Sequence, residues 1–340
     1  MYNNISYIDN QDDTKKSVNT FLEEWYNESP FISVNTSGST GSSVQVFLKK
    51  ENMIISAKKT IDFLGIQPNS TTLLCLSIET IAGKMMVVRS IIGNLALIIG
   101  PTNSNPLKNI DLNIDFAAFV PLQIQKILDS NPEKLKAIKS TIVGGGPISN
   151  KLEYQLKQQE ITLFHTFGMT ETISHVALRR VGFKGENFFR GLKGICFSVE
   201  NGQLIIHYPE IGLTELKTTD LVKLNSDNTF EWIGRADFII NSGGIKINPE
   251  EVEFTLSFLI SQPFLIAGLP DEKLGKKVVL IIESQENMNF SKIDFTSILS
   301  KYSIPKMVYF IPKFERTLSG KINRIETVKL LKKYVAKEIL

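Results

Sequence analysis

Short apolar segments alternate with longer amphipathic segments along the first half of this sequence, and this alternation leaves few folds open to it. The apolar segments are typical of buried strands, and the longer ones carry apolar residues at helical spacing. Strands separated by helices predict a mostly parallel sheet covered by helices. The predicted strands are 72–77, 95–99, 116–120, 141–143 and 161–164, and the predicted helices are 52–64, 84–92, 122–128 and 150–158.

The pattern changes after residue 197, where short strands are separated by Gly, Asn, Asp and Pro. A small β-rich subdomain is expected there, followed by a hinge in the Gly-rich stretch 234–249. The fold class is therefore α/β, with a large N-terminal domain, 1–235, and a small mobile α+β C-terminal domain, 236–340. Strands are predicted at 203–207, 220–224, 229–233, 264–268 and 277–282, and helices at 250–260 and 327–339.

Composition narrows the function classes. Of the 340 residues, 42% are apolar and 21% are charged, which excludes a disordered chain. The net charge of +3 comes without a block of one sign, which argues against nucleic-acid binding. The cysteines Cys75 and Cys196 lie far apart, and the longest apolar stretch, 85–100, is interrupted by Arg89 and Asn94. We expect a soluble, cytoplasmic protein without an integral membrane segment that acts on small molecules.

A loop of small hydroxyl residues and glycines lies between the apolar segment 31–34 and the first predicted helix. Glycines let successive backbone N–H groups converge on one anion, so such a loop is suited to phosphate. It lacks the Lys and Ser or Thr that follow the last Gly of a Walker A loop, and a flexible linker stays open as the alternative. The loop comprises Thr36, Ser37, Gly38, Ser39, Thr40 and Gly41.

Two further motifs follow predicted strands. The run 144–147, Gly-Gly-Gly-Pro, either lets a flat ring approach the backbone or forms a tight turn. The stretch 165–172 brings Phe167, Thr170 and Glu171 together, which suffices to stack a base, bond a phosphate and hold a divalent cation. A lone carboxylate in a loop is usually only solvated, so this interpretation depends on the other motifs.

Side chains suited to binding a ligand also occur later in the chain, at three separate positions. Asp220 offers two acceptors for the hydroxyls of a ribose, and Arg235 is a permanent cation. Lys321 follows a Ser-Gly turn, from which a long ammonium could reach a site. Each is more often part of a surface turn, and the order of the motifs gives them weight.

In this order, TSGSTG, GGGP, FGMTE, TTD, GRAD with SGGIKI, and LSGKINR resemble the motif series of the adenylate-forming acyl-CoA synthetases and ligases, over residues 33–324. The stretches IAGKMMVVRS, FVPLQIQKIL and FHTFGMTETISHVALR are most similar to the o-succinylbenzoate:CoA ligases of menaquinone biosynthesis, especially their short forms. The resemblance implies ATP, Mg²⁺ and CoA as reactants. The acid would first attack the α-phosphorus of ATP to form an acyl adenylate, and the CoA thiol would then displace AMP.

The resemblance also implies roles for residues. The loop 36–41 corresponds to the β/γ-phosphate loop, and Gly145, Gly146 and Pro147 flank adenine. Phe167 stacks on the base within a nucleotide-binding stretch that includes Gly168 and Met169. Thr170 bonds the α-phosphate and Glu171 holds magnesium. Asp220 and Arg235 contact the ribose, Asp237 is the hinge, and Lys321 serves adenylation. After rotation at the hinge, Gly243 and Gly244 line the thiol path, with Lys246 beside them on the substrate side.

Departures from the family pattern leave alternatives open. Val44 stands where many relatives have a loop lysine, and the usual aromatic or histidine is not evident around 79–81. The proposed acid carries a second carboxylate, for which Lys84 and His175 are the candidates. They are otherwise a helix-terminal lysine and a histidine packed in a strand. The alternatives are a ligase for another carboxylic acid and a non-catalytic nucleotide-binding relative. An apolar patch where the missing N-terminal part packs in relatives would favour a homo-oligomer.

Overall fold

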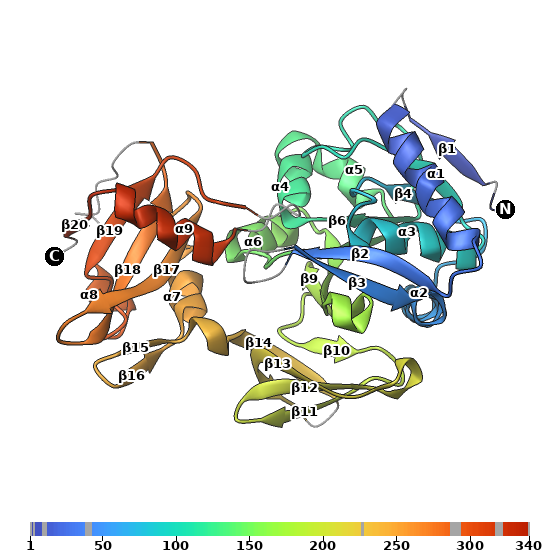
Figure 1. Ribbon diagram of the computed structural model, residues 1–340. Helices are drawn as coiled ribbons and strands as arrows, with labels where there is room; N and C mark the ends of the chain where they lie inside the picture. The colour runs from blue at the N-terminus through green and yellow to red at the C-terminus, as the bar shows by residue number, and fades with distance from the viewer. Residues whose placement is uncertain are drawn as a thin grey trace.

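One twelve-stranded sheet organises the chain up to Arg235 (Figure 1). The computed structural model describes residues 2, 4–8, 12–37, 43–225, 228–285, 294–316 and 322–338. The sheet is parallel from its first strand to β8 and antiparallel from β8 onward. The parallel part confirms the expectation from the first half of the sequence. In spatial order its strands are β1 (Ile5–Tyr7), β5 (Ala96–Ile99), β4 (Thr71–Leu74), β6 (Phe116–Phe119), β7 (Ser140–Val143) and β8 (Thr162–Gly168).

The antiparallel half forms the β-rich subdomain that the sequence predicts. It is not a detached sheet, because β9 and β10 join it to β8 by backbone hydrogen bonds. The strands are, in spatial order, β9 (His175–Gly182), β10 (Phe189–Gly191), β14 (Thr229–Arg235), β13 (Leu213–Leu224), β12 (Gln203–Tyr208) and β11 (Cys196–Glu200).

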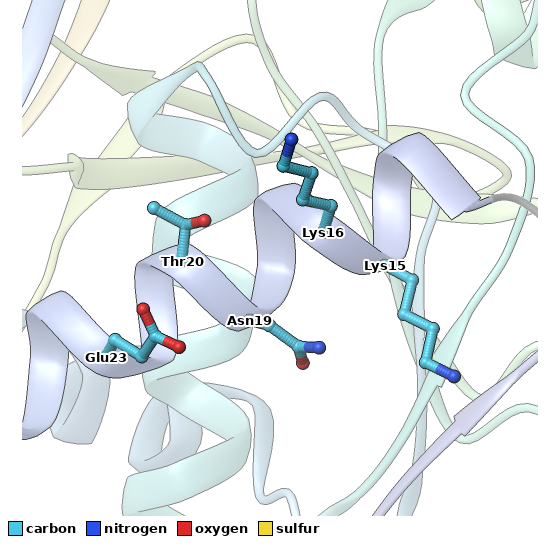
Figure 2. Close-up of a pocket in the computed structure, with 5 residues that line it drawn as sticks. All are labelled: Lys15, Lys16, Asn19, Thr20 and Glu23. Atoms are coloured by element: carbon cyan, nitrogen blue, oxygen red, sulfur yellow. The ribbon is translucent and has the colours of Figure 1, made fainter.

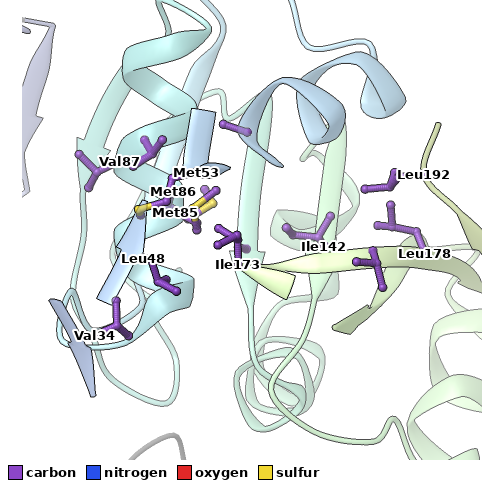
Figure 3. Packing of buried hydrophobic residues seen from close by; sticks show 14 of the residues in the cluster. Val34, Leu48, Met53, Met85, Met86, Val87, Ile142, Ile173, Leu178 and Leu192 are labelled. Carbon is purple, nitrogen blue, oxygen red and sulfur yellow. The ribbon is translucent and has the colours of Figure 1, made fainter. Parts of the chain in front are cut away.

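Helices cover both faces of the parallel half. Neighbouring residues of a strand point to opposite faces, so Leu74 belongs to the core under α1–α3 while Leu73 belongs to the core under α4–α6. In the first core, Met53, Met85 and Met86 lie together near Leu48 (Figure 3). The helices are α1 (Asp12–Tyr26), α2 (Lys50–Leu64), α3 (Ile81–Ile92), α4 (Pro121–Ser130), α5 (Pro132–Lys136) and α6 (Asn150–Gln158). None of the helices in the described ranges is long and apolar enough to cross a membrane.

The segments on either side of the hydroxyl-rich loop form a separate hairpin. Strands β2 (Phe31–Ser37) and β3 (Ser43–Lys49) pair antiparallel, and α2 starts at Lys50. The predicted apolar segment is thus a strand, and a second strand that the sequence did not predict lies between the loop and the helix. Burial alternates from residue 45 to residue 49, as expected for a strand on a two-stranded ribbon.

The C-terminal part has its own cores, built from residues between Ile240 and Leu331. The twelve-stranded sheet ends at Arg235, where the domain boundary is predicted; the division into two moving domains stays a prediction. Asn150 of α6 bridges the two parts, since its side-chain amide donates to the carbonyl oxygen of Phe254 and to Ser257 Oγ, both at 3.2 Å. The elements are β15 (Ile240–Ser242), β16 (Ile245–Ile247), α7 (Pro249–Leu256), β17 (Phe264–Asp271), β18 (Gly275–Glu283), α8 (Phe295–Ile298), β19 (Met307–Ile311), α9 (Arg324–Leu330) and β20 (Lys337–Glu338).

The predicted C-terminal helix 327–339 is wrong in its second half. α9 ends at Leu330, and β20 pairs antiparallel with β19 through Val308 and Lys337. The edge of β19 offers unpaired backbone groups, and the end of the chain satisfies them as a strand. The predicted helix 250–260 is likewise shorter, because α7 ends at Leu256.

Candidate active site

The carboxyl ends of β7 and β8 meet at one edge of the sheet, as neighbouring parallel strands must. Gly144 follows β7, and a Cβ there would lie 2.4 Å from Thr166 Oγ1 of β8. Gly145 has φ of 83°, which favours glycine, and the Gly146 carbonyl oxygen lies 3.1 Å from Nε2 of His165. The Gly-Gly-Gly-Pro run is thus a tight turn packed on β8, between β7 and α6 as the sequence predicts.

The motif 165–172 begins inside a strand instead of after it. β8 extends to Gly168 because β9 pairs with it, and Gly168 opposes His175. A 3-10 turn, Thr170–Thr172, follows, and Thr172 Oγ1 accepts from the Met169 N–H at 3.0 Å. The turn presents the exposed Glu171 at the end of β8.

Backbone strain marks the end of this turn. Ile173 has φ of 68°, a left-handed conformation that β-branched residues rarely adopt. The side chain is buried in the first core, which holds the backbone in that conformation. Strain of this kind concentrates at functional sites, and here it directly follows the turn that carries Thr170 and Glu171.

An aromatic cluster fixes the ring of Phe167. Its centroid lies 5.0 Å from that of Phe230 in an edge-on arrangement and 5.7 Å from that of Phe189. The ring is half-buried, and Phe167 lies on β8, the strand that pairs with β7. Its stacking on a base stays a prediction.

The predicted ribose contacts face each other across β13 and β14. Asp220 pairs with Arg235 in the register, and Asp220 Oδ1 accepts from the indole N–H of Trp232 at 2.9 Å. Arg235 donates to Oδ2 of Asp237 at 2.9 Å, and Thr219 donates to the same oxygen at 3.0 Å. The structure thus joins the candidate ribose-binding arginine to the candidate hinge residue.

Several sequence-predicted residues contribute less to this geometry. Gly243 and Gly244, with φ of 60° and 83°, form the two-residue turn between β15 and β16, and Lys246 is exposed on β16. Thr36 and Ser37 lie at the end of β2. Gly38, Ser39, Thr40, Gly41 and Lys321 lie outside the described residues.

Lys84 and His175, the candidates for the second carboxylate, lie in different surroundings. Lys84 is inside α3 and not at its end, and its Nζ is 3.7 Å from Oε2 of Glu24 and 4.8 Å from the ring centroid of Phe21, both in α1. His175 is buried at the start of β9, opposite Gly168. Burial, and secondarily the charge of Arg89, lower the pKa of His175 well below its usual value.

Arg89 was not among the sequence candidates, although it occupies the buried face of α3 with only 2% exposure. Its Nη2 donates to Ser174 Oγ at 2.8 Å, and its Nη1 lies 3.8 Å from Sδ of Met86. Nε has no partner among the described residues, and burial lowers the pKa of the guanidinium to about 9. The signal in the sequence was a lone cation inside the apolar stretch 85–100.

A buried guanidinium without a carboxylate is costly, because its hydration is lost and nothing replaces it. Arg89 takes part in none of the ion pairs between described residues. Its contact with Ser174 Oγ places the guanidinium just after the turn that follows the carboxyl end of β8. Ligands of open α/β sheets bind outside the carboxyl ends of the strands. Arg89 is therefore suited to an anionic group of a ligand.

The donor set for a metal is small. Among the residues that the structure describes, no three His, Cys, Asp or Glu side chains form a group that could hold a metal ion. Magnesium, however, usually binds through one or two carboxylates and the phosphates of a substrate. An exposed Glu171 at the end of β8 fits that requirement.

A shallow surface depression on α1 does not belong to this site (Figure 2). The residues that line it come from a single helix and are all exposed. Such a surface offers a ligand few contacts. They are Lys15, Lys16, Asn19, Thr20 and Glu23.

Comparison with known proteins matches this architecture to one family. Residues 6–191 match the family model described as AMP-binding enzyme. The chain is 26% identical over 333 residues to a 2-succinylbenzoate–CoA ligase of Listeria monocytogenes, covering 89% of this chain and 70% of that enzyme. A 2-succinylbenzoate–CoA ligase of Enterococcus faecalis is also 26% identical, over 94% of this chain and 74% of that enzyme.

Solved structures agree with the sequence matches. An acyl-CoA synthetase (AMP-forming)/AMP-acid ligase II-like protein from Dyadobacter fermentans is 31% identical, with a TM-score of 0.64 over 95% of both chains. The o-succinylbenzoate-CoA synthetase of Bacillus subtilis in complex with the acyl-adenylate intermediate has a TM-score of 0.75 at 20% identity, over 91% of this chain and 70% of that chain. The second likeness extends only to the fold.

Proposed function

The chain belongs to the AMP-binding enzyme family, and we propose that it is an ATP-dependent acid–CoA ligase that acts on o-succinylbenzoate, in menaquinone biosynthesis. The observation that carries this choice of acid is the buried Arg89, which has no carboxylate partner among the described residues and donates to Ser174, just after the turn that bears Thr170 and Glu171. The proposed acid has two carboxylates, of which only one is activated. The matched 2-succinylbenzoate–CoA ligases support the same choice.

The proposed reaction has two steps. In the first, a carboxylate oxygen of the acid attacks the α-phosphorus of ATP, and the bond to the bridging oxygen of pyrophosphate breaks. In the second, the CoA thiol loses its proton and attacks the acyl carbonyl, and AMP leaves with its electron pair. Both steps build negative charge on oxygen atoms, so fixed donors and cations lower their barriers.

Residues at the sheet edge would bind the nucleotide. The Gly-Gly-Gly-Pro turn and the fixed ring of Phe167 would enclose the base, and the Thr170 hydroxyl would bond the α-phosphate. Asp220 and Arg235 would hold the ribose. Glu171 would bind Mg²⁺, which neutralises phosphate charge when it is present. Lys321 would supply a point charge between the attacking carboxylate and the α-phosphate.

Arg89 would receive the second carboxylate of the acid. A guanidinium offers a planar edge of parallel N–H donors, and Nε is a donor that has no partner in the described part of the chain. A monocarboxylic acid would leave this cation unneutralised, so the site would select dicarboxylic acids. ATP and CoA are cytoplasmic metabolites, and we place the reaction in the cytoplasm for that reason.

ATP–pyrophosphate exchange without CoA tests the proposal. Exchange is expected with o-succinylbenzoate and not with a panel of monocarboxylic aryl and acyl acids. Exchange with another acid alone would keep the ligase chemistry and refute the substrate. Bound ATP without exchange for any acid would identify the non-catalytic alternative.

A further inference from the structure

A buried chain of polar groups links α2, β9 and α3. His175 lies in its middle, with Nε2 3.0 Å from Thr60 Oγ1 of α2 and Nδ1 3.4 Å from Ser174 Oγ. Ser174 Oγ in turn accepts from Nη2 of Arg89 at 2.8 Å. Thr60 and Arg89 are both at most 2% exposed and His175 is 6% exposed, so water does not replace these contacts.

The hydroxyl of Thr60 determines which ring nitrogen carries hydrogen. Thr60 donates its only hydroxyl hydrogen to the carbonyl oxygen of Ser56, at 3.2 Å. Its oxygen can then only accept from the ring, so hydrogen is assigned to Nε2. The ring is neutral, because burial and Arg89 lower the pKa of His175. Nδ1 is therefore an acceptor.

Because Nδ1 is an acceptor, it fixes the direction in which the Ser174 hydroxyl donates. Ser174 donates its hydrogen to Nδ1, and its oxygen lone pairs are then available to the Arg89 guanidinium. All of these hydrogen bonds therefore run in one direction. Arg89 donates to Ser174 and Ser174 to His175. His175 donates to Thr60, and Thr60 to the carbonyl oxygen of Ser56. If the ring were the Nδ1–H tautomer, its N–H would compete with the arginine for the lone pairs of Ser174 Oγ, and Nε2 would be left without a donor.

We infer that His175 is a positioning residue for the acid: through Ser174 it holds Arg89 with its Nε donor open to the second carboxylate. The inference rests on the proposed function, and it assigns His175 a role without substrate contact. Thr60 is the second positioning residue, since it selects the tautomer. This series of hydrogen bonds gives a role to Thr60, Ser174 and His175, three polar side chains that the adenylation chemistry itself does not use.

Paired substitutions test the inference in the steady state. His175→Leu removes both ring contacts, and Thr60→Val removes the hydroxyl with little change of shape. The KM for o-succinylbenzoate is expected to rise about tenfold for His175→Leu and about threefold for Thr60→Val, with KM for ATP and kcat within about twofold. His175→Gln and Thr60→Ser keep a donor and an acceptor, and both are expected to restore KM to within about threefold of wild type.

An unchanged KM for the acid in His175→Leu would overturn the inference. An equal rise of KM for the acid and for ATP would also overturn it, since that pattern reports general damage. Thermal unfolding and ATP binding of each variant show whether it is folded.

The histidine ring can also be observed without any substrate. The chain has 3 histidines, so ¹⁵N-labelled His175 can be assigned by comparison with His175→Gln. Its nitrogen shifts are expected to show the neutral Nε2–H tautomer, and Thr60→Val is expected to mix the tautomers. An Nδ1–H or doubly protonated ring near neutral pH would overturn the inference. A silent exchange assay would instead refute the proposed function, so the two failures are distinguishable.

Discussion

The nucleotide side and the acid side of the candidate site are built in opposite ways. At the carboxyl ends of β7 and β8, glycines, a 3-10 turn and exposed side chains form an open edge. Around Arg89, the polar groups are buried between α2, α3 and β9 and bond mainly to one another. The first arrangement relies on backbone geometry, and we propose that it accommodates the nucleotide. The second uses charge in the interior, which only a particular ligand would neutralise.

The largest effect is expected at the reacting atoms. Lys321→Ala should lower ATP–pyrophosphate exchange on the order of 1,000-fold, because a cation at the developing charge is lost. Exchange kinetics with o-succinylbenzoate provide the measurement, and Lys246→Ala is the control from the same domain. A Lys321→Ala protein with full exchange would contradict the adenylation role of this lysine.

Loss of the buried cation should affect the acid and spare the nucleotide. Arg89→Met is expected to lower kcat/KM for o-succinylbenzoate about 100-fold, with KM for ATP nearly unchanged, because a buried charge pair is removed from the complex. The free protein should be as stable as wild type or more stable, since a buried unpaired charge is gone. An equal loss of kcat/KM for the acid and for ATP would show that Arg89 does not serve the acid alone.

Backbone geometry on the nucleotide side can be tested with two neighbouring glycines. Gly144→Ala places a Cβ 2.4 Å from Thr166 Oγ1, whereas the nearest atom to a Cβ at Gly146 is 3.8 Å away. Gly144→Ala should cost about 2 kcal/mol of unfolding free energy and raise KM for ATP. Gly146→Ala should be tolerated. Urea unfolding measures both, and equal stabilities would show that the close approach is unimportant.

The smallest effect is a dependence of stability on pH from the acid side. The pKa of His175 is lowered in the folded protein by burial and by Arg89, so below about pH 6.5 the unfolded chain binds a proton that the folded one does not. Stability should therefore fall with decreasing pH, by up to about 1.4 kcal/mol per pH unit from this group. Urea unfolding at about pH 5.5 and 7.5 should show a smaller loss for His175→Gln. Identical slopes would mean that His175 is protonated when folded.

The residues proposed for the nucleotide are visible in the sequence and those proposed for the acid are not, for a physical reason. Phosphate and adenine contacts depend on glycines and hydroxyls at fixed spacing, which are visible in the chain as motifs. The strand and helix alternation likewise located β7, β8 and α6 within a few residues. The strand β3, residues 43–49, was not among the predicted strands.

The acid side depends on residues that only the fold brings together. Thr60, Arg89 and Ser174 are far apart in sequence, and none stands in a motif that carries chemistry by itself. His175 was selected as a carboxylate ligand, but its geometry is that of a neutral ring between two hydroxyls. Lys84 was selected for its charge, which is paired with Glu24.

The most direct test of the central claim is to isolate the intermediate. The protein is mixed with ATP labelled at the α-phosphate, Mg²⁺ and o-succinylbenzoate without CoA, and the products are separated before and after CoA is added. The account predicts a labelled acyl adenylate that CoA converts to the CoA thioester and AMP. Absence of the adenylate with this acid, in protein that binds ATP, would contradict it.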